Sequence, residues 1–182
     1  LDLYIGTYKR CQKKWLKMLE VKDNFLNKEY FNKIQKEILS DYFPWYYNFN
    51  ITNTKDSKNK FYFTHNIFSD LSKEYQYGVN SSYFPLFKNF LIKIKCNSIL
   101  RIKANLHLNL NKKEIHQPHQ DYSFSHKGCL LYLNDNNGLT YFGKKSVKPK
   151  ANRVVFFDPS EKHSSSLCTD ANRRVNINFN YF

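Results

Sequence analysis

The chain has 182 residues, 41% of them hydrophobic and 18% aromatic, so it is long enough for one domain with a sizeable core and is not expected to be disordered. Its formal net charge is +14, but most of the basic residues are lysines that are spread along the chain rather than gathered into one run. Nucleic-acid binding is therefore possible but not favoured, because an AT-rich genome would also encode many lysines and asparagines.

No apolar stretch approaches the eighteen residues that a membrane-spanning helix needs, and the N-terminus lacks the pattern of a signal peptide. The four cysteines contain no CxxC pair, which argues against a zinc finger or a disulfide framework. We therefore expect a cytoplasmic protein with reduced thiols and no membrane contact.

The N-terminal part predicts a helix followed by strands. Asn27 is a suitable helix cap, and Phe31, Ile34 and Ile38 follow at helical spacing. The helix is expected to end before the aromatic segment at 41–49, which contains a proline and favours a strand.

Beyond this segment, residues 52–60 are polar and predict a loop, and residues 61–68 have a strand-like pattern. A second helix is predicted within 82–94, where apolar residues recur at every fourth position.

From residue 99 the hydrophobic period changes to two. In the segment 99–110, Ile102, Ala104 and Leu106 alternate with polar residues. Further short strand-like runs follow, separated by turn signals, at 128–134, 138–143, 153–158 and 173–182. This order predicts an α+β fold in one domain, with helices first and then a mostly antiparallel β core of the sandwich or barrel type.

A candidate metal site follows the first of these strands. His119 and Asp121 are separated by one residue, so on extended backbone both side chains point to the same side, and His163 follows a later core strand. Two imidazoles and one carboxylate form the facial triad that binds Fe(II) and leaves coordination positions open. Zinc accepts the same ligands, so the ligand types alone do not select the metal.

An arginine on the last predicted strand adds a second feature. Alternation places Arg174, Asn176 and Asn178 on one face and the apolar residues on the other. A buried arginine is costly unless it pairs with an anion, and its planar fork suits a carboxylate. An iron site beside such an arginine indicates an organic acid as co-substrate.

The segments PHQD, LLYLNDNNGLTYF, VKPKANRVVFFD, KHSSS and RRVNINFNYF together resemble the Fe(II)/2-oxoglutarate-dependent dioxygenases of the prolyl-4-hydroxylase-like type. The likeness is greatest to the compact members that marine bacteriophages and bacteria encode, which would place the protein in the host cytoplasm. It implies a double-stranded β-helix (jelly-roll) core over about 99–182, with helices packed on one sheet. Residues 1–98 would form the helical lead-in and the substrate-side strands of the same domain.

Residue by residue, the resemblance makes His119, Asp121 and His163 the iron ligands. It assigns the distal carboxylate of 2-oxoglutarate to Arg174, which fits the family spacing better than Arg173 does. The remaining co-substrate contacts or pocket residues that it implies are Tyr132, Thr140, Asn176 and His107. His107 stands where many relatives have a tyrosine. It either donates the same hydrogen bond to the co-substrate or contacts the residues around the site without touching the co-substrate.

The activity that the resemblance implies is hydroxylation of a peptide, an amino acid or a metabolite, with dioxygen consumed and succinate and CO2 released. Asp121 favours hydroxylation, because related halogenases lack this carboxylate. Two alternatives stay open: a non-catalytic basic jelly-roll binding protein, and a zinc-dependent hydrolase with the same ligands. His116 and His126 are interpreted as neighbours of the motif and not as ligands, and His65 is interpreted as structural.

Overall fold

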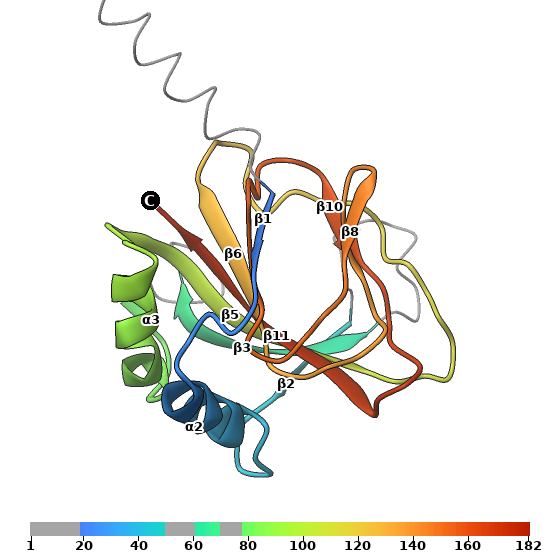
Figure 1. The fold of residues 1–182 in the computed structure, drawn as a ribbon, viewed down its shortest axis with the longest axis horizontal. Coiled ribbons are helices and arrows are strands. Elements are labelled where there is room, and N and C mark those ends of the chain that lie inside the picture. The colour runs from blue at the N-terminus through green and yellow to red at the C-terminus, as the bar shows by residue number, and fades with distance from the viewer. Residues whose placement is uncertain (1–18, 50–60, 70–77) are drawn as a thin grey trace, which may run out of the picture.

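The structure is a computed structural model that describes residues 19–49, 61–69 and 78–182. The loop predicted at 52–60 and Cys11 lie outside the described residues. The three cysteines within them, Cys96, Cys129 and Cys168, are all free thiols. Two antiparallel sheets face each other, and the helices lie on the outer side of the larger one (Figure 1).

In the described part of the chain, the large sheet has eight strands. Its order is β1 (Glu20–Lys22), β9 (Val154–Phe157), β6 (Lys127–Tyr132), β11 (Arg173–Tyr181), β5 (Ile99–Leu108), β3 (Tyr62–Ser69) and β2 (Tyr46–Asn48), with β4 (Gly78–Val79) paired to β3. The small sheet has the order β10 (His163–Ser165), β7 (Thr140–Phe142) and β8 (Lys145–Val147). Every strand pair between described residues is antiparallel.

The strands predicted from alternation are therefore present, and the mostly antiparallel β core is confirmed. Four strands escaped prediction, namely β1, β4, β8 and β10. Each has two or three residues, which is too short for a hydrophobic period to be read.

The first predicted helix is α2 (Lys28–Ile38), and the side chain of Asn27 accepts a hydrogen bond from the backbone N–H of Tyr30 at 2.8 Å. The second lies within 82–94 as predicted, but it is divided into a 3₁₀ turn, η1 (Phe84–Phe87), and α3 (Lys88–Lys93). Pro85 lies in the first turn of η1, a position that suits proline because the N–H it lacks would be unpaired there anyway. No described helix is both long and apolar enough to cross a membrane.

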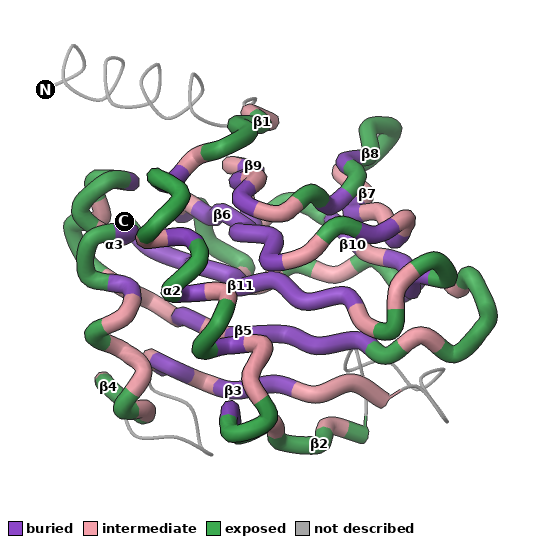
Figure 2. The backbone as a smooth tube through the Cα atoms, turned by 60° about the horizontal axis from the view of Figure 1, so that its bottom comes forward, coloured by how far each residue is buried: buried purple, intermediate pink, exposed green. Residues whose placement is uncertain are grey.

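The main hydrophobic core lies between the helices and one face of the large sheet, where the strand residues are buried (Figure 2). It joins Phe31, Ile34 and Ile38 of α2 and Phe90 of α3 to the apolar positions of the strands. A second, smaller core between the two sheets contains Leu130, Tyr132, Val147, Val155 and Phe157. Alternate residues of β6 thus contribute to different cores, as the period of two requires.

The register of β5 and β11 arranges the polar face of the large sheet. Arg174 pairs with His107, Asn176 with Asn105, and Asn178 with Lys103. Polar residues of both strands thus alternate with residues of the main core and face the space between the sheets. This inward face is where the candidate site lies.

Replacing the cap of α2 tests how much the helix end contributes to stability. We expect Asn27→Ala to lower the free energy of unfolding by about 1 kcal/mol, because the N–H of Tyr30 loses its acceptor. Urea unfolding followed by circular dichroism measures the change. Lys28→Ala, an exposed change one residue later, is the matched control and should stay within about 0.5 kcal/mol of the wild type. An equal loss in both variants would contradict the capping role.

Candidate metal centre

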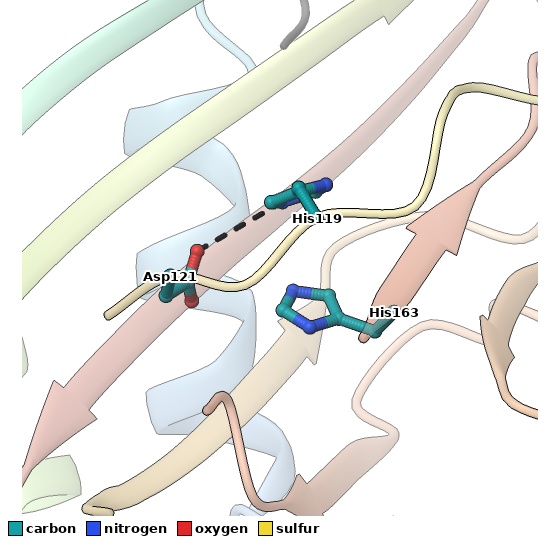
Figure 3. Close-up of side chains that lie close together, drawn as sticks. All are labelled: His119, Asp121 and His163. Carbon is teal, nitrogen blue, oxygen red and sulfur yellow. Dashed lines mark ion pairs between the residues drawn. The ribbon is translucent and has the colours of Figure 1, made fainter. Parts of the chain in front are cut away.

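The proposed ligands lie together although 44 residues separate the histidines in sequence (163 − 119 = 44). His119 and His163 form an antiparallel bridge in which each backbone N–H donates to the other residue's carbonyl, both at 2.9 Å. Figure 3 shows the side chains of His119, Asp121 and His163 converging on one point. One ligand atom from each residue lies within 4.8 Å of the others, and all three residues line one cavity between the sheets.

The carboxylate of Asp121 is held from both sides. Arg101 Nη2 lies 2.9 Å from Oδ1, and the amide of Asn178 donates to Oδ2 at 3.0 Å. Burial alone would raise the pKa of Asp121, but Arg101, His163 and Asn178 outweigh it and hold the pKa well below its ordinary value. Asp121 is therefore anionic and oriented before any metal enters.

The two imidazoles are also prepared for a metal. Nδ1 of His163 lies 3.0 Å from the carbonyl oxygen of Glu161, an arrangement in which the ring donates at Nδ1 and leaves Nε2 as a ligand. Burial and then the neighbouring His163 lower the pKa of His119 to about 4, so its ring is neutral near pH 7. Neutral imidazole is the form that binds a metal.

The depressed pKa of His119 can be measured in the metal-free protein. We expect its ring to titrate with a midpoint near 4 rather than near the ordinary value of about 6.5. Folding then disfavours protonation, so this group costs stability as the pH falls from about 6.5 towards 4, and the cost is absent above that range. NMR of the ring nitrogens gives the midpoint, and His119→Gln identifies the signal. A midpoint of 6 or above would contradict the expectation.

Arg174 is only 1% exposed, which makes it one of the most deeply buried large side chains of the described residues. Its Nη2 donates to Thr140 Oγ1 at 2.7 Å, and the Tyr132 hydroxyl lies 2.6 Å from the same oxygen. Burial lowers the pKa of Arg174. Within residues 19–49, 61–69 and 78–182 no carboxylate pairs with this guanidinium, and its Nε has no hydrogen-bond partner.

The neighbouring arginine differs. Arg173 donates through Nη2 to the backbone carbonyl of Leu39, which follows α2, at 2.9 Å. It does not line the cavity of the metal ligands, whereas Arg174 does.

The other predicted co-substrate residues line the same cavity or its wall. Asn176 accepts a hydrogen bond from Asn105 at 3.1 Å. His107 is stacked between Tyr62 and His116, with ring centroids 5.3 and 5.0 Å away. Burial and the neighbouring His116 lower the pKa of His107 well below its ordinary value, so the ring is neutral, and its Nδ1 has no hydrogen-bond partner.

The histidines interpreted as neighbours have contacts of their own. The ring of His126 lies 2.9 Å from Phe124 O and 2.9 Å from Asn180 Oδ1, and His65 lies 2.7 Å from both Pro44 O and Ser81 Oγ. These contacts tie loops to strands.

His116 lies nearer the site, since its Nδ1 is 2.9 Å from Ser165 Oγ and its ring stacks on His107.

Three site residues were not assigned from the sequence: Arg101 and Asn178, which hold Asp121, and Lys103, which lines the cavity. The alternation of polar and apolar residues had placed Lys103 and Asn178 on the polar faces of their strands. This was the only sequence feature that pointed to a place in the site. Their role depends on the pairing of β5 with β11, which alternation does not give.

No protein-family model matches the sequence, and no curated protein matches it. Solved structures do match by fold. A 2OG-Fe(II) oxygenase family oxidoreductase from Burkholderia pseudomallei is 13% identical and superposes with a TM-score of 0.65 over 90% of this chain and 84% of its own. A Trichoplax adhaerens prolyl hydroxylase, solved with a hypoxia inducible factor peptide fragment, is 11% identical with a TM-score of 0.62 over 100% and 93%.

A prolyl-4-hydroxylase from Pseudomonas putida is similar at 11% identity, with a TM-score of 0.54 over 90% of this chain and 91% of its own. At such low identity these likenesses show the fold. They confirm the jelly-roll architecture predicted from the sequence.

Proposed function

We propose that this chain is an Fe(II)- and 2-oxoglutarate-dependent dioxygenase that hydroxylates a peptidyl residue or a small molecule and releases succinate and CO2. The observation that carries the proposal is a fully buried arginine without an anionic partner among the described residues, in the same cavity as a His–Asp–His cluster. A metal alone would need only the cluster. The arginine requires an organic anion as well.

The metal would be held by His119, Asp121 and His163. Their donor set of two neutral imidazoles and one carboxylate fits Fe(II), and the preformed contacts of Asp121 and His163 fit a metal site. When bound, the iron would supply the oxygen chemistry, and the chain would supply position and charge.

The co-substrate would be held by Arg174, through charge-assisted hydrogen bonds to its distal carboxylate. Tyr132 and Thr140 already share a hydrogen bond beside the guanidinium and would complete the anion pocket. Asn176 and the neutral His107 would line the path from this pocket towards the metal ligands. Arg174 and Tyr132 are buried, so the distal carboxylate would be held away from bulk solvent.

The substrate class is part of the proposal, and solved structures of the same fold support it. The Trichoplax adhaerens enzyme is a prolyl hydroxylase solved with a peptide, which supports a peptide or a small molecule. Nucleic acid stays possible but is not favoured. Three further features stay predictions. They are a single domain over 1–182 with its core from about residue 99, a cytoplasmic location, and a phage origin.

Succinate release tests the proposal. The wild type, given Fe(II), 2-oxoglutarate, dioxygen and a panel of peptides and amino acids, should release succinate, and His163→Ala should release none. A wild type that binds neither iron nor 2-oxoglutarate would leave the non-catalytic binding protein as the better reading. Metal analysis of protein purified without added metal, with zinc found and no iron affinity, would favour the hydrolase.

A further inference from the structure

The cavity of the metal ligands contains a second cation that the proposed function does not use. Lys103, on β5, lines this cavity together with His119, Asp121 and Arg174. Its side chain is half-buried, and its Nζ lies 3.5 Å from the hydroxyl of Tyr62 and 5.8 Å from the centroid of the same ring. A lysine on the inner face of a sheet needs a reason, because burial penalises its charge.

Among the described residues no carboxylate lies within ion-pair distance of Lys103. Asp121 is the acid with which it interacts at longer range, but both oxygens of Asp121 are already bonded, to Arg101 and to Asn178. Burial and then the like charge of Arg101 lower the pKa of Lys103 to about 7. Among the described residues, then, no acid pairs directly with the Lys103 amine, and Asp121 attracts it only from longer range.

Lys103 and Arg174 come from positions that are well separated along the paired strands. In the β5–β11 register Arg174 pairs with His107, and Lys103 lies four residues from His107 on β5. Lys103 and Arg174 are therefore four residues apart along the strand direction. That spacing is about 13 Å at 3.3 Å per residue. A five-carbon dicarboxylate spans roughly 6 Å, with carbon–carbon bonds of about 1.5 Å. A molecule of 2-oxoglutarate is thus shorter than the separation of the two backbone positions, and we assign Lys103 to another ligand.

We propose that Lys103, assisted by the hydroxyl of Tyr62, binds an anionic group, a carboxylate or a phosphate, on the primary substrate. This inference rests on the proposed function and specifies its substrate class. Tyr62 is protonated, because burial raises its pKa, and its hydroxyl can donate to the same anion that the ammonium attracts. The contact would orient the substrate beside Asp121 without involving the anion pocket of Arg174.

Equilibrium binding tests this inference. Protein loaded anaerobically with Fe(II) and 2-oxoglutarate is titrated with matched pairs of probes. N-acetylated amino acids are compared with their amides, which detects a carboxylate, and nucleoside 5′-monophosphates with nucleosides, which detects a phosphate. In at least one series the anionic member should bind at least about tenfold more tightly than its neutral partner. Lys103→Gln and Lys103→Met should abolish this ratio, and Lys88→Gln, an exposed lysine on α3, should retain it.

Three results would overturn the inference: no charge preference in either series, a preference that survives both Lys103 variants, or a loss of 2-oxoglutarate affinity in those variants as large as the loss of probe affinity. The last would assign Lys103 to the co-substrate. Thermal melts and two different substitutions separate these results from misfolding. Failure of the wild type to bind iron or 2-oxoglutarate would refute the proposed function itself, and it is seen before any probe is added.

Discussion

Arg174→Met should weaken 2-oxoglutarate binding by at least about 30-fold without destabilising the ligand-free protein. Truncating one partner of a buried charge pair costs roughly 2 to 5 kcal/mol, which corresponds to a rise in Kd of about 30-fold to several thousand-fold. The ligand-free protein, in contrast, loses a guanidinium that no described carboxylate compensates. Its free energy of unfolding should therefore stay equal or rise, because the desolvation penalty is removed.

The measurements are isothermal titration with 2-oxoglutarate on metal-loaded protein and urea unfolding without either ligand. Thr140 keeps its hydrogen bond with Tyr132 in the variant, so the wall of the pocket remains supported. Arg173→Met is the matched control, because its guanidinium bonds to Leu39 and does not line the cavity. Unchanged 2-oxoglutarate affinity in Arg174→Met, or a large loss of stability, would mean that Arg174 has a structural role.

His163→Ala should remove the metal. The variant loses one of the three ligands that converge on a single point, so we expect the Kd for Fe(II) to rise by at least about 100-fold, more than the loss of a supporting residue would cause. A metal present at 100 times its Kd stabilises the folded state by about 2.7 kcal/mol. That stabilisation should be seen in the wild type and be absent from the variant in thermal melts with and without metal.

His116→Gln is the control for this experiment, because His116 belongs to the same sequence motif but is not one of the clustered ligands. Its metal affinity should stay close to that of the wild type. If His116→Gln and His163→Ala lost metal equally, the assignment of the ligands would be wrong. Atomic absorption on the dialysed proteins gives the metal content directly.

Much of the fold could be read from local patterns. The cap at Asn27 and the alternation along 99–110 predicted α2 and β5, because capping and side-chain alternation depend on residues near in sequence. The division of the second helix between Phe87 and Lys88 was missed, and so were four strands of two or three residues. In these segments the local pattern is short, and the backbone conformation depends on the packing of neighbouring elements.

By itself the sequence determined the ligand types, the spacing of His119 and Asp121, and the inward face that carries Arg174. Only the tertiary structure decided that His163 lies beside His119, that Arg101 and Asn178 hold Asp121, and that Lys103 faces the same cavity without a carboxylate partner among the described residues. The physical reason is that these contacts depend on strand register and on a bridge between segments far apart in sequence. Hydrophobic alternation assigns a residue to a face of a sheet, but it does not say which residue of the next strand will lie opposite.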